Sequence, residues 1–592
     1  MKKRNQIEDK YKWNLNDIYS DEELLLKDIE ELKTYPEKIS AYKGKLKKIN
    51  KCLEFFQLST EISKVCERVF SYIGLRLSEN MENNKFIELE SVVSEISKKI
   101  SVASSFEEEE LLKCGEKYIK KLLADERFAV YKIELNDFLR NKEHILPERE
   151  EIIISKVRKS LGGYSDVFDN LDNLDIKFES VKDGKGKLHE VNQHNYIELL
   201  ENKDRVLRKN AYTSFTKGYN NFNNTISSNY ISSVEGDWFL ADVYGFKSCL
   251  EMSLHGDNLP SELYEKLLSN IRNNVKYVHK FYKLKKKVLG YSDYSVYDKF
   301  ISITNWNKKY SYEECFDIVL NALSVFGDEY IEGLVTARDS GWIDVYPCEK
   351  KEGGGYCLSM FRPHPYILLN TVEDSSSIYT LAHELGHAMH GYLSAKNQPY
   401  ENYDHTIFLA EIASTVNEVL LFKYLFANST KKQEKLFHIE KYIQNIISTI
   451  YVQTMFSEFE HFAHNLVENG EPIGKEILNK KYSELIDNYY GNSLKNTKED
   501  IGAGWSRIPH FYRPYYVYKY ATGMTSAINF AKGIYDGNKN VLDNYLNFLK
   551  SGSKDYSYDT LKNAGIDLME DTPYSVLFEE LDWALKEMDN LI

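Results

Sequence analysis

The sequence predicts a mainly α-helical protein, and three observations lead to this fold class. Residues 22–110 place apolar side chains at three- and four-residue spacing among Lys and Glu, as amphipathic helices do. The same spacing resumes after His194. Alternating, β-branched or aromatic runs are confined to two short regions, residues 175–191 and 342–370. We therefore expect many packed helices with only small sheets.

The N-terminal region is predicted to be a set of helices that pack against one another and carry no chemistry. The apolar spacing predicts helices over Glu22–Tyr35, Glu37–Leu46, Lys51–Leu77 and Asn84–Glu110. Pro36 separates the first two, because the residue before a proline tends to leave the helix. Helical character continues over residues 128–159, where Pro147 stands at a possible new start.

A β-hairpin is predicted where this region ends. Residues 175–181 alternate with period two, and Asp183-Gly184 separates them from a second short run, residues 187–191. This hairpin divides the chain into an N-terminal helical region, residues 1–193, and a main body, residues 194–592.

Within the main body, one helix and one small sheet can be placed. Pro260 opens a helix whose apolar stripe runs through residues 263–278, and Gly290 closes it. Residues 342–370 predict a small sheet just before the most informative helix of the chain. The run 353–355 consists of three glycines, but no Gly-Lys-Ser/Thr follows, which excludes a phosphate loop. Two interpretations remain: a strand edge along which a substrate backbone pairs, or a plain turn.

Composition excludes several classes of protein. With 42% hydrophobic residues among 592, the chain can fill a large core, and its net charge of −14 argues against general nucleic-acid binding. Seven scattered cysteines without a C-x-x-C pair indicate reduced thiols rather than a disulfide frame. Neither a secretory signal nor an apolar run of membrane-spanning length is found. We expect a soluble, cytoplasmic protein that binds neither nucleic acid nor membrane.

The chemistry is concentrated in His383-Glu384-Leu385-Gly386-His387, which contains H-E-x-x-H. Asp374 and Ser375 provide a capping signal, and no proline follows before residue 399, so the motif is predicted to lie on a helix. One helical turn apart, two imidazoles can hold one zinc ion. Glu384 then lies beside the open coordination position, where it can take a proton from a water bound to the metal.

A catalytic zinc ion needs a third protein ligand. The metzincin pattern is excluded because residues 390 and 393 are His and Leu instead of Gly and His. His390 lies about 10 Å along the helix from His383, so we expect it to support or pack rather than to bind. The remaining candidates are Glu401, His405, Glu411 and Glu418.

Among these candidates, Glu411 is the best third ligand. Glu401 and His405 lie in a polar loop, whereas Glu411 is embedded in an apolar helical run, where a carboxylate is costly unless it is paired or metal-bound. The alternative for Glu411 is a salt bridge to Lys or Arg. Glu418, two turns further on, is placed to orient a ligating histidine through its free ring N–H. We take His383, His387 and Glu411 as the metal set.

These motifs resemble the M3 family of zinc oligopeptidases, and most of all oligoendopeptidase F. HELGHAMH followed by EIASTVNE is similar to the family pattern of HExxH and then Glu in an E-x-x-S/T segment. The resemblance extends over nearly the whole chain, through residues 13–15, 140–151, 297–298, 342–344, 364–370, 508–512, 515–523 and 564–567. At residues 351–356 the chain has KEGGGY instead of the expected KRSGAY.

The resemblance implies an elongated, mostly helical metallopeptidase body with a deep substrate channel and one Zn²⁺ per chain at its floor. It implies hydrolysis of internal bonds in short peptides. It also implies that His510 and tyrosines of residues 515–518 face the zinc, with Tyr518 and Tyr515 as further donors. Such donors would stabilise the oxyanion of the tetrahedral intermediate.

Three alternatives stay open. The enzyme could be an exopeptidase, such as a dipeptidyl carboxypeptidase, that needs a free terminus. The protein could instead be a helical scaffold with a purely structural metal, although such sites usually complete four protein ligands. The native ion could also be cobalt or manganese rather than zinc.

Overall fold

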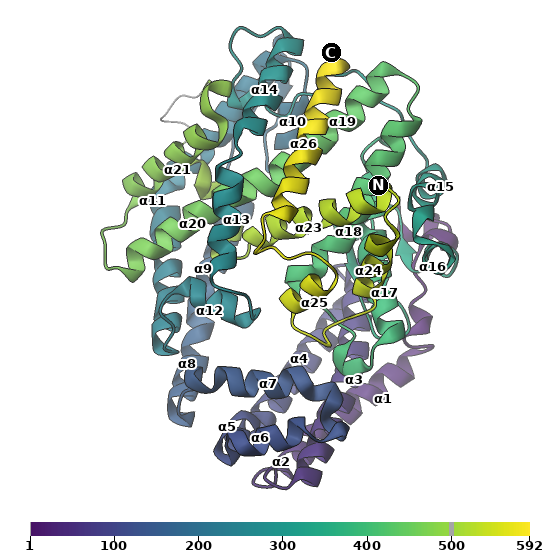
Figure 1. Cartoon of the computed structure of the whole chain (residues 1–592), viewed down its shortest axis with the longest axis vertical. Coiled ribbons are helices and arrows are strands. Elements are labelled where there is room, and N and C mark those ends of the chain that lie inside the picture. The colour runs from purple at the N-terminus through teal and green to yellow at the C-terminus, as the bar shows by residue number, and fades with distance from the viewer. Residues whose placement is uncertain (1, 496–501) are drawn as a thin grey trace. The chain divides into compact units, whose positions relative to one another are not determined.

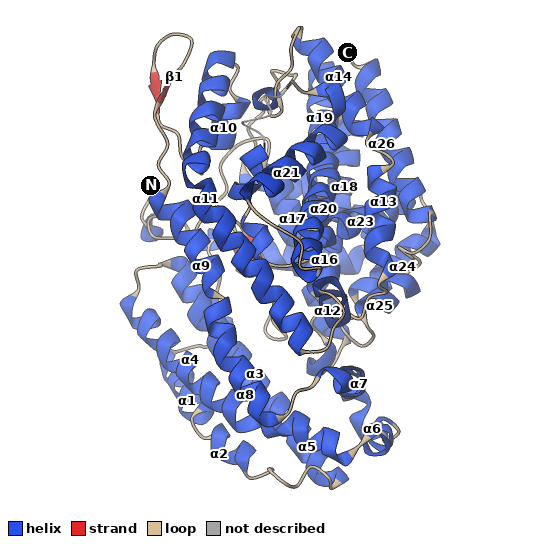
Figure 2. Ribbon diagram, turned by 90° about the vertical axis from the view of Figure 1, so that its left-hand side faces the viewer, coloured by secondary structure: helices blue, strands red, loops and turns tan. Residues whose placement is uncertain are grey.

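Helices dominate the structure, a computed structural model that describes residues 2–495 and 502–592 (Figures 1 and 2). Contacts divide the chain into two compact units of non-contiguous segments. Unit 1 comprises residues 1–145, 307–421 and 530–566, and unit 2 comprises residues 146–306, 422–529 and 567–592. The predicted division at residue 193 stays a prediction about domain organisation. None of the described helices combines the length and apolar character needed to cross a membrane.

Unit 1 contains the N-terminal helices and the helix of the H-E-x-x-H motif. Its helices are α1 Glu22–Leu32, α2 Tyr35–Ser40, α3 Ile49–Glu79, α4 Asn84–Ser104, α5 Phe106–Cys114, α6 Glu116–Leu123, α7 Lys132–Arg140, α15 Tyr312–Leu323, α16 Asp328–Asp339, α17 Ser377–Asn397, α24 Lys539–Leu549 and α25 Ser557–Asn563. Two further helices, α18 Ile407–Asn428 and α23 Tyr518–Tyr535, begin in one unit and end in the other.

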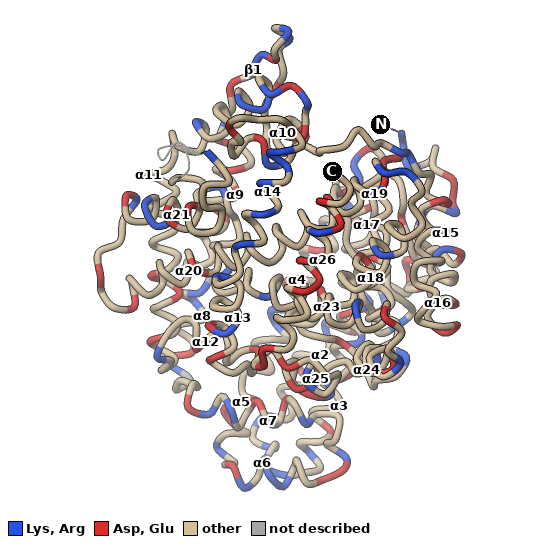
Figure 3. Tube along the Cα trace, turned by 45° about the horizontal axis from the view of Figure 1, so that its top comes forward, with Lys and Arg blue, Asp and Glu red and all other residues tan. Residues whose placement is uncertain are grey.

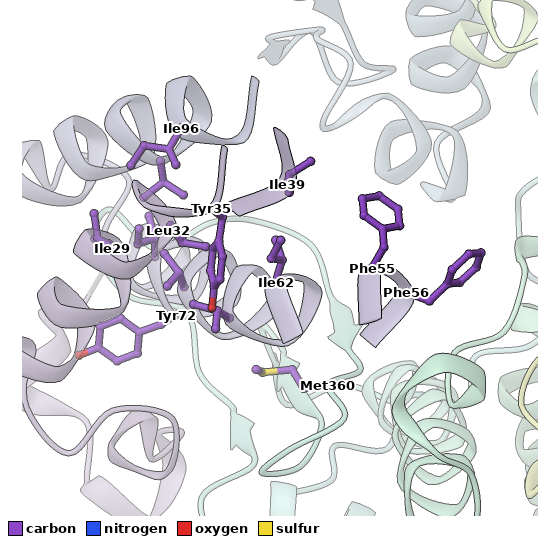
Figure 4. Packing of buried hydrophobic residues seen from close by; sticks show 14 of the residues in the cluster. Ile29, Leu32, Tyr35, Ile39, Phe55, Phe56, Ile62, Tyr72, Ile96 and Met360 are labelled. Carbon is purple, nitrogen blue, oxygen red and sulfur yellow. The ribbon is translucent and has the colours of Figure 1, made fainter. Parts of the chain in front are cut away.

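The N-terminal helices form the core that the apolar spacing predicts. Their buried stripes meet in one cluster that includes Leu32, Tyr35, Phe55 and Phe56 (Figure 4). Met360, which is far away in the sequence, packs into the same cluster and joins the sheet region to these helices. Burial of this much apolar surface, at about 25 cal/mol per Å², is the main stabilising contribution.

The small sheet of unit 1 lies where the sequence places it. Strands β3 Ile343–Asp344, β4 Tyr356–Leu358 and β5 Tyr366–Leu368 have the order β3-β5-β4. The central strand β5 is parallel to β3 and antiparallel to β4, so β4 is an edge strand. Helix α17 packs against β4 and β5. The predicted sheet next to the motif helix is therefore confirmed.

Unit 2 is a second helical body. Its helices are α8 Glu148–Leu161, α9 Gly163–Asn170, α10 Tyr196–Glu201, α11 Arg205–Val243, α12 Cys249–Gly256, α13 Glu262–Arg272, α14 Lys276–Leu289, α19 Lys432–Ile446, α20 Gln453–Glu468, α21 Lys475–Tyr490 and α26 Thr572–Asn590. The predicted hairpin is present but short: β1 Val181–Lys182 pairs with β2 Leu188–His189, and residues 175–180 form no strand.

Several helix boundaries were predicted wrongly. The helix predicted over Asn84–Glu110 is divided at residue 105 into α4 and α5, and the helix predicted to end at Leu46 ends at Ser40. The sequence predicted a single helix from residue 260 to Gly290, whereas the structure has α13 and α14 with a break at residues 273–275. The apolar stripe continues across the break, so its spacing alone could not reveal it. Gly290 does end α14, with a left-handed φ of 65° that glycine adopts without steric cost.

Candidate active site

The motif helix α17 begins where its capping signal predicts. The Asp374 Oδ1 atom accepts hydrogen bonds from the backbone N–H groups of Ser376 (2.9 Å) and Ser377 (2.8 Å). These contacts satisfy donors that the first turn of a helix leaves without partners. The helix then runs without a break to Asn397 and buries one side of the motif.

Helices α17 and α18 touch backbone to backbone at Gly386. A Cβ atom at this position would lie 2.5 Å from the Cα of Ser414, so only glycine permits the approach. The same crossing is fixed by Asn417, whose Nδ2 donates to the carbonyl of Ala382 (3.1 Å) and whose Oδ1 accepts from the Tyr330 hydroxyl (3.0 Å). The close crossing brings side chains of α18 against the motif.

Three potential metal-binding atoms converge at this crossing. The Nε2 atoms of His383 and His387 are 3.2 Å apart, and the Oε2 atom of Glu411 lies 3.5 Å from the first and 3.7 Å from the second. Zinc bonds of about 2.0–2.1 Å in tetrahedral geometry separate ligand atoms by about 3.3 Å. These residues therefore fit one zinc ion, and across residues 2–495 and 502–592 no other cluster of this kind is found.

The alternative for Glu411, a salt bridge to Lys or Arg, is not seen among the described residues. In the described part of the chain, no lysine or arginine forms an ion pair with this carboxylate. Its other contact is with the Ser414 hydroxyl, which donates to the Oε2 atom at 3.3 Å. The carboxylate is thus held in place while it faces the two imidazoles.

Glu418 contacts the far side of His383, as the sequence suggests. The Oε1 atom lies 2.5 Å from the His383 Nδ1 atom, so the ring presents Nε2 to the cluster. Burial by itself lowers the pKa of His383, but the hydrogen bond and charge of Glu418 outweigh it and raise the pKa to about 9. Burial and the neighbouring His383 lower the pKa of His387 to about 3, so that ring is neutral.

Glu384 is buried beside the edge strand. A Cβ atom at Gly355 would lie 3.6 Å from the Glu384 Oε1 atom, so the last glycine of the run lies beside this carboxylate. Burial raises the pKa of Glu384 to about 7, partly opposed by His383 and reinforced by Glu411. A carboxylate with this pKa can take up and release a proton near neutral pH.

The other candidates for the third ligand lie elsewhere. Glu401 accepts a hydrogen bond from the Thr60 hydroxyl (2.9 Å). His405 stacks on the buried ring of His390, with centroids 3.8 Å apart, and His390 also packs on Phe548. His390 is therefore a packing residue, and neither Glu401 nor His405 belongs to the metal cluster.

His510 and the tyrosines that follow it lie in unit 2, in different surroundings. Tyr515 and Tyr518 are fully buried. The Tyr515 hydroxyl lies 3.0 Å from the Nδ1 atom of His461, and the ring of Tyr518 packs on Tyr264 at 5.3 Å. His510, by contrast, is partly exposed. The roles of Tyr515 and Tyr518 as oxyanion donors stay predictions.

Two tyrosines lie next to His510: Tyr516, which belongs to the predicted set of residues 515–518, and Tyr520, which was not predicted. The Tyr520 hydroxyl is 3.5 Å from the His510 Nε2 atom and 3.3 Å from the Tyr516 hydroxyl, and both tyrosines are partly exposed. Helical spacing does not distinguish Tyr518 from Tyr520, because residues 521–528 of the same helix are all buried.

Comparisons with known proteins show the family to which the chain belongs. Residues 198–579 match the model of peptidase family M3, and residues 110–178 match the model named Oligopeptidase F. Oligopeptidase PepF of Bacillus subtilis is 33% identical over 602 residues, covering 100% of this chain and 89% of the relative.

Two solved structures are also similar. A protein from Chlamydophila abortus described as a peptidase has 29% identity and a TM-score of 0.92, covering 100% of both chains. Oligoendopeptidase-F from Enterococcus faecium has 27% identity and a TM-score of 0.75, covering 96% of this chain and 98% of its own. The chain belongs to peptidase family M3 and is a metalloendopeptidase of the oligoendopeptidase F type.

Proposed function

We propose that this protein is a zinc-dependent endopeptidase that hydrolyses internal bonds of short peptides. The observation that carries the proposal is the convergence of His383, His387 and Glu411 within zinc-binding distances beside the buried carboxylate of Glu384. Three protein ligands leave one coordination position open, which a catalytic site needs and a structural zinc site usually lacks. Short peptides are favoured because relatives of the chain are named oligopeptidases.

His383, His387 and Glu411 would hold the ion. Zinc bound there would supply Lewis acidity, lowering the pKa of water at the open position and polarising the scissile carbonyl. Glu418 fixes the orientation of the His383 ring through Nδ1, and Ser414 does the same for the carboxylate of Glu411.

Glu384 is proposed as the general base. Its carboxylate takes the proton of the attacking water and then passes it to the leaving amine. Burial supports this role because it raises the pKa of Glu384 to about 7, close to the pH at which both transfers must occur. In the described part of the chain no hydrogen bond engages this carboxylate, so both oxygens are available for water and substrate.

The edge strand β4 is proposed to hold the substrate backbone. In the β3-β5-β4 order, one side of β4 pairs with β5 and the other side has no strand partner in the described sheet. A peptide lying along that side would pair through backbone hydrogen bonds. Gly355, at the start of β4, lies against both Glu384 and the carbonyl of Leu368. This placement favours the strand-edge interpretation of the glycine run over a plain turn.

By resemblance to family M3, His510 is proposed as an oxyanion donor together with the partly exposed Tyr520 beside it, and Tyr515 and Tyr518 stay the donors that the sequence predicted. His510 and Tyr520 are both partly exposed, and burial together with the charge of Arg513 lowers the pKa of His510, which keeps its ring neutral. A neutral imidazole or phenol can donate a hydrogen bond to a developing oxyanion.

The proposal is tested with Glu384→Gln and an internally quenched peptide blocked at both ends. We expect this variant to retain zinc by elemental analysis and to lose about 10²–10⁴-fold in kcat, since general base catalysis contributes about that much. His383→Ala is the contrasting variant, because it should lose the ion itself. Wild-type turnover by Glu384→Gln would overturn the mechanism. Failure of the wild type to cleave any doubly blocked peptide would instead support an exopeptidase.

A further inference from the structure

Unit 2 contains a cavity of about 110 Å³ that the proposed chemistry does not use. Helices α10, α11, α20 and α21 surround it, together with the short 3₁₀ helices η7 Val296–Asp298 and η12 Ala503–Arg507. Much of its wall is apolar, including the side chains of Leu200, Phe215, Val452, Met455, Phe456 and Ile486. A cavity of this composition favours the apolar part of a small ligand.

One part of the wall is positively charged. The lining includes Lys299 and Arg507 together with the tyrosines Tyr482 and Tyr490. The Lys299 Nζ atom donates to the Tyr490 hydroxyl at 2.7 Å and lies 4.3 Å from the centre of the same ring. Burial, reinforced by the positive charge of Arg507, lowers the pKa of the Lys299 ammonium group. The site thus holds a cation in surroundings that disfavour it.

Two carboxylates near Lys299, those of Asp298 and Glu440, are each paired with other cations. Asp298 pairs with Arg205 and Arg208, each at 2.8 Å. Glu440 pairs at 2.9 Å with Lys285, whose Nζ atom also donates to the backbone carbonyl of Lys299. Among residues 2–495 and 502–592, neither Lys299 nor Arg507 has a carboxylate within ion-pair distance. The positive charge of Lys299 therefore has no counterion in the described structure, whereas Arg507 is exposed and also interacts with the carboxylate of Asp172, the hydrogen-bond partner of Tyr219 in the wall.

We propose that this cavity binds a small apolar carboxylic acid, with the carboxylate at Lys299 and Arg507 and the apolar group against Phe215 and Met455. An anion at this position would be paired with both cations and could accept a hydrogen bond from the Tyr482 hydroxyl, for which no partner is found in the described residues. Charge-assisted hydrogen bonds of this kind are about twice as strong as neutral ones. The apolar walls would reject a small inorganic anion, which has no surface to bury.

The same chemistry is presented by a free apolar acid and by the C-terminal residue of a short apolar peptide. Both have a carboxylate one to three bonds from a hydrocarbon group. No residue that lines the cavity belongs to the metal cluster, and the ligand of the cavity can be studied by binding alone. The proposal is therefore independent of the proposed peptidase mechanism.

The test uses isothermal titration of the full chain with 3-phenylpropionate, and with 3-phenylpropanamide as its uncharged counterpart. We expect at least tenfold tighter binding of the acid, because only the acid pairs with the two cations. Lys299→Met should abolish this preference while keeping the apolar stem. Lys283→Met, which removes an exposed lysine of α14, is the matched control and should bind like the wild type.

A second variant, Thr216→Phe, fills the cavity from α11 and should remove binding of both compounds. Thermal melts establish whether each variant is folded. If Thr216→Phe does not fold, Lys299→Met still provides the test. Equal affinity of the wild type for acid and amide, no binding of the acid, or an unchanged preference in Lys299→Met would overturn the proposal. If N-acetyl-leucyl-phenylalanine competes with 3-phenylpropionate for the cavity, the site is assigned to peptide C-termini. If it does not compete, the site is assigned to free acids.

Discussion

At the scale of single residues, His383 has the most connected position in the proposed metal site. Its Nε2 atom faces His387 and Glu411, while its Nδ1 atom lies 2.5 Å from Glu418. The negative charge of Glu418 makes the imidazole a stronger electron-pair donor and fixes its orientation. Glu418 would therefore act on a bound metal ion without touching it.

Glu418→Gln keeps the size of the side chain and removes its charge. We expect zinc affinity to fall by about 10–100-fold, the usual effect of removing such an outer partner. Competition with a calibrated chelator measures this change. Asp328→Asn, at an exposed position of α16, is the control for loss of one negative charge. Unchanged zinc affinity in Glu418→Gln would show that this carboxylate does not support the site.

The tyrosines after His510 also differ at this scale. Tyr520→Phe removes a partly exposed hydroxyl next to His510, and we expect kcat to fall by about 10²–10³-fold with a smaller change in KM. Tyr518→Phe removes a buried hydroxyl for which the described structure shows no hydrogen-bond partner, so activity should stay near that of the wild type. Steady-state kinetics on one quenched peptide compares the two. A larger loss of kcat in Tyr518→Phe than in Tyr520→Phe would support Tyr518 as the oxyanion donor.

At the scale of secondary-structure elements, the crossing of α17 and α18 decides whether the site exists. Each helix provides part of the metal set: His383 and His387 come from α17, and Glu411 comes from α18. Their spacing depends on the absence of a side chain at Gly386, because its hydrogen faces the backbone of Ser414. A one-carbon addition would push the two helices apart.

Gly386→Ala should therefore weaken zinc binding more than its small size suggests. The added Cβ atom would lie 2.5 Å from a backbone atom, and overpacking of this kind costs about 1–3 kcal/mol. Gly74→Ala in α3 is the matched control, since nothing lies within 4 Å of its Cβ position and alanine favours a helix by about 0.5–1 kcal/mol. Zinc content and thermal melts of both variants are compared. Wild-type zinc affinity in Gly386→Ala would refute the close-crossing argument.

At the scale of the whole molecule, acidic residues outnumber basic ones, and residues of both signs are spread along the chain (Figure 3). One of the acidic residues is held at a cost. Partial burial, reinforced by the charges of Glu134 and Glu108, raises the pKa of Glu107 to about 8. This carboxyl group binds its proton more tightly in the folded chain than in the unfolded chain.

This difference predicts a loss of stability as the pH rises. A carboxyl group whose pKa is raised by folding contributes to stability when it is protonated. This contribution is fully present below the pKa in the unfolded chain, about 4.3, and is lost as the pH rises through the pKa in the folded chain, about 8 for Glu107. Glu107→Gln should therefore unfold about 1–3 °C higher than the wild type at pH 9 and show little difference at pH 4. Calorimetric scans at both pH values measure this. Glu88→Gln, at an exposed position, should show no such pH dependence, and the same behaviour in both variants would contradict the assignment.

Much of the fold and part of the site follow from local sequence. The apolar spacing located most of the N-terminal helices, and Asp374 marked the start of α17 within three residues. Glu411 was found because a carboxylate within an apolar helical run needs a partner. The break between α13 and α14 was missed, because a buried stripe can continue across two helices in line.

The sequence by itself determined the helical class, the H-E-x-x-H helix and the choice of Glu411 and Glu418, because these depend on spacing along one or two helices. Only the tertiary structure decided which residues meet. It brought Glu411 to His383 through a glycine contact, placed Tyr515 and Tyr518 in the interior, and left His510 and Tyr520 together and partly exposed. The physical reason is that burial and convergence depend on contacts between segments far apart in the chain, which local periodicity does not encode.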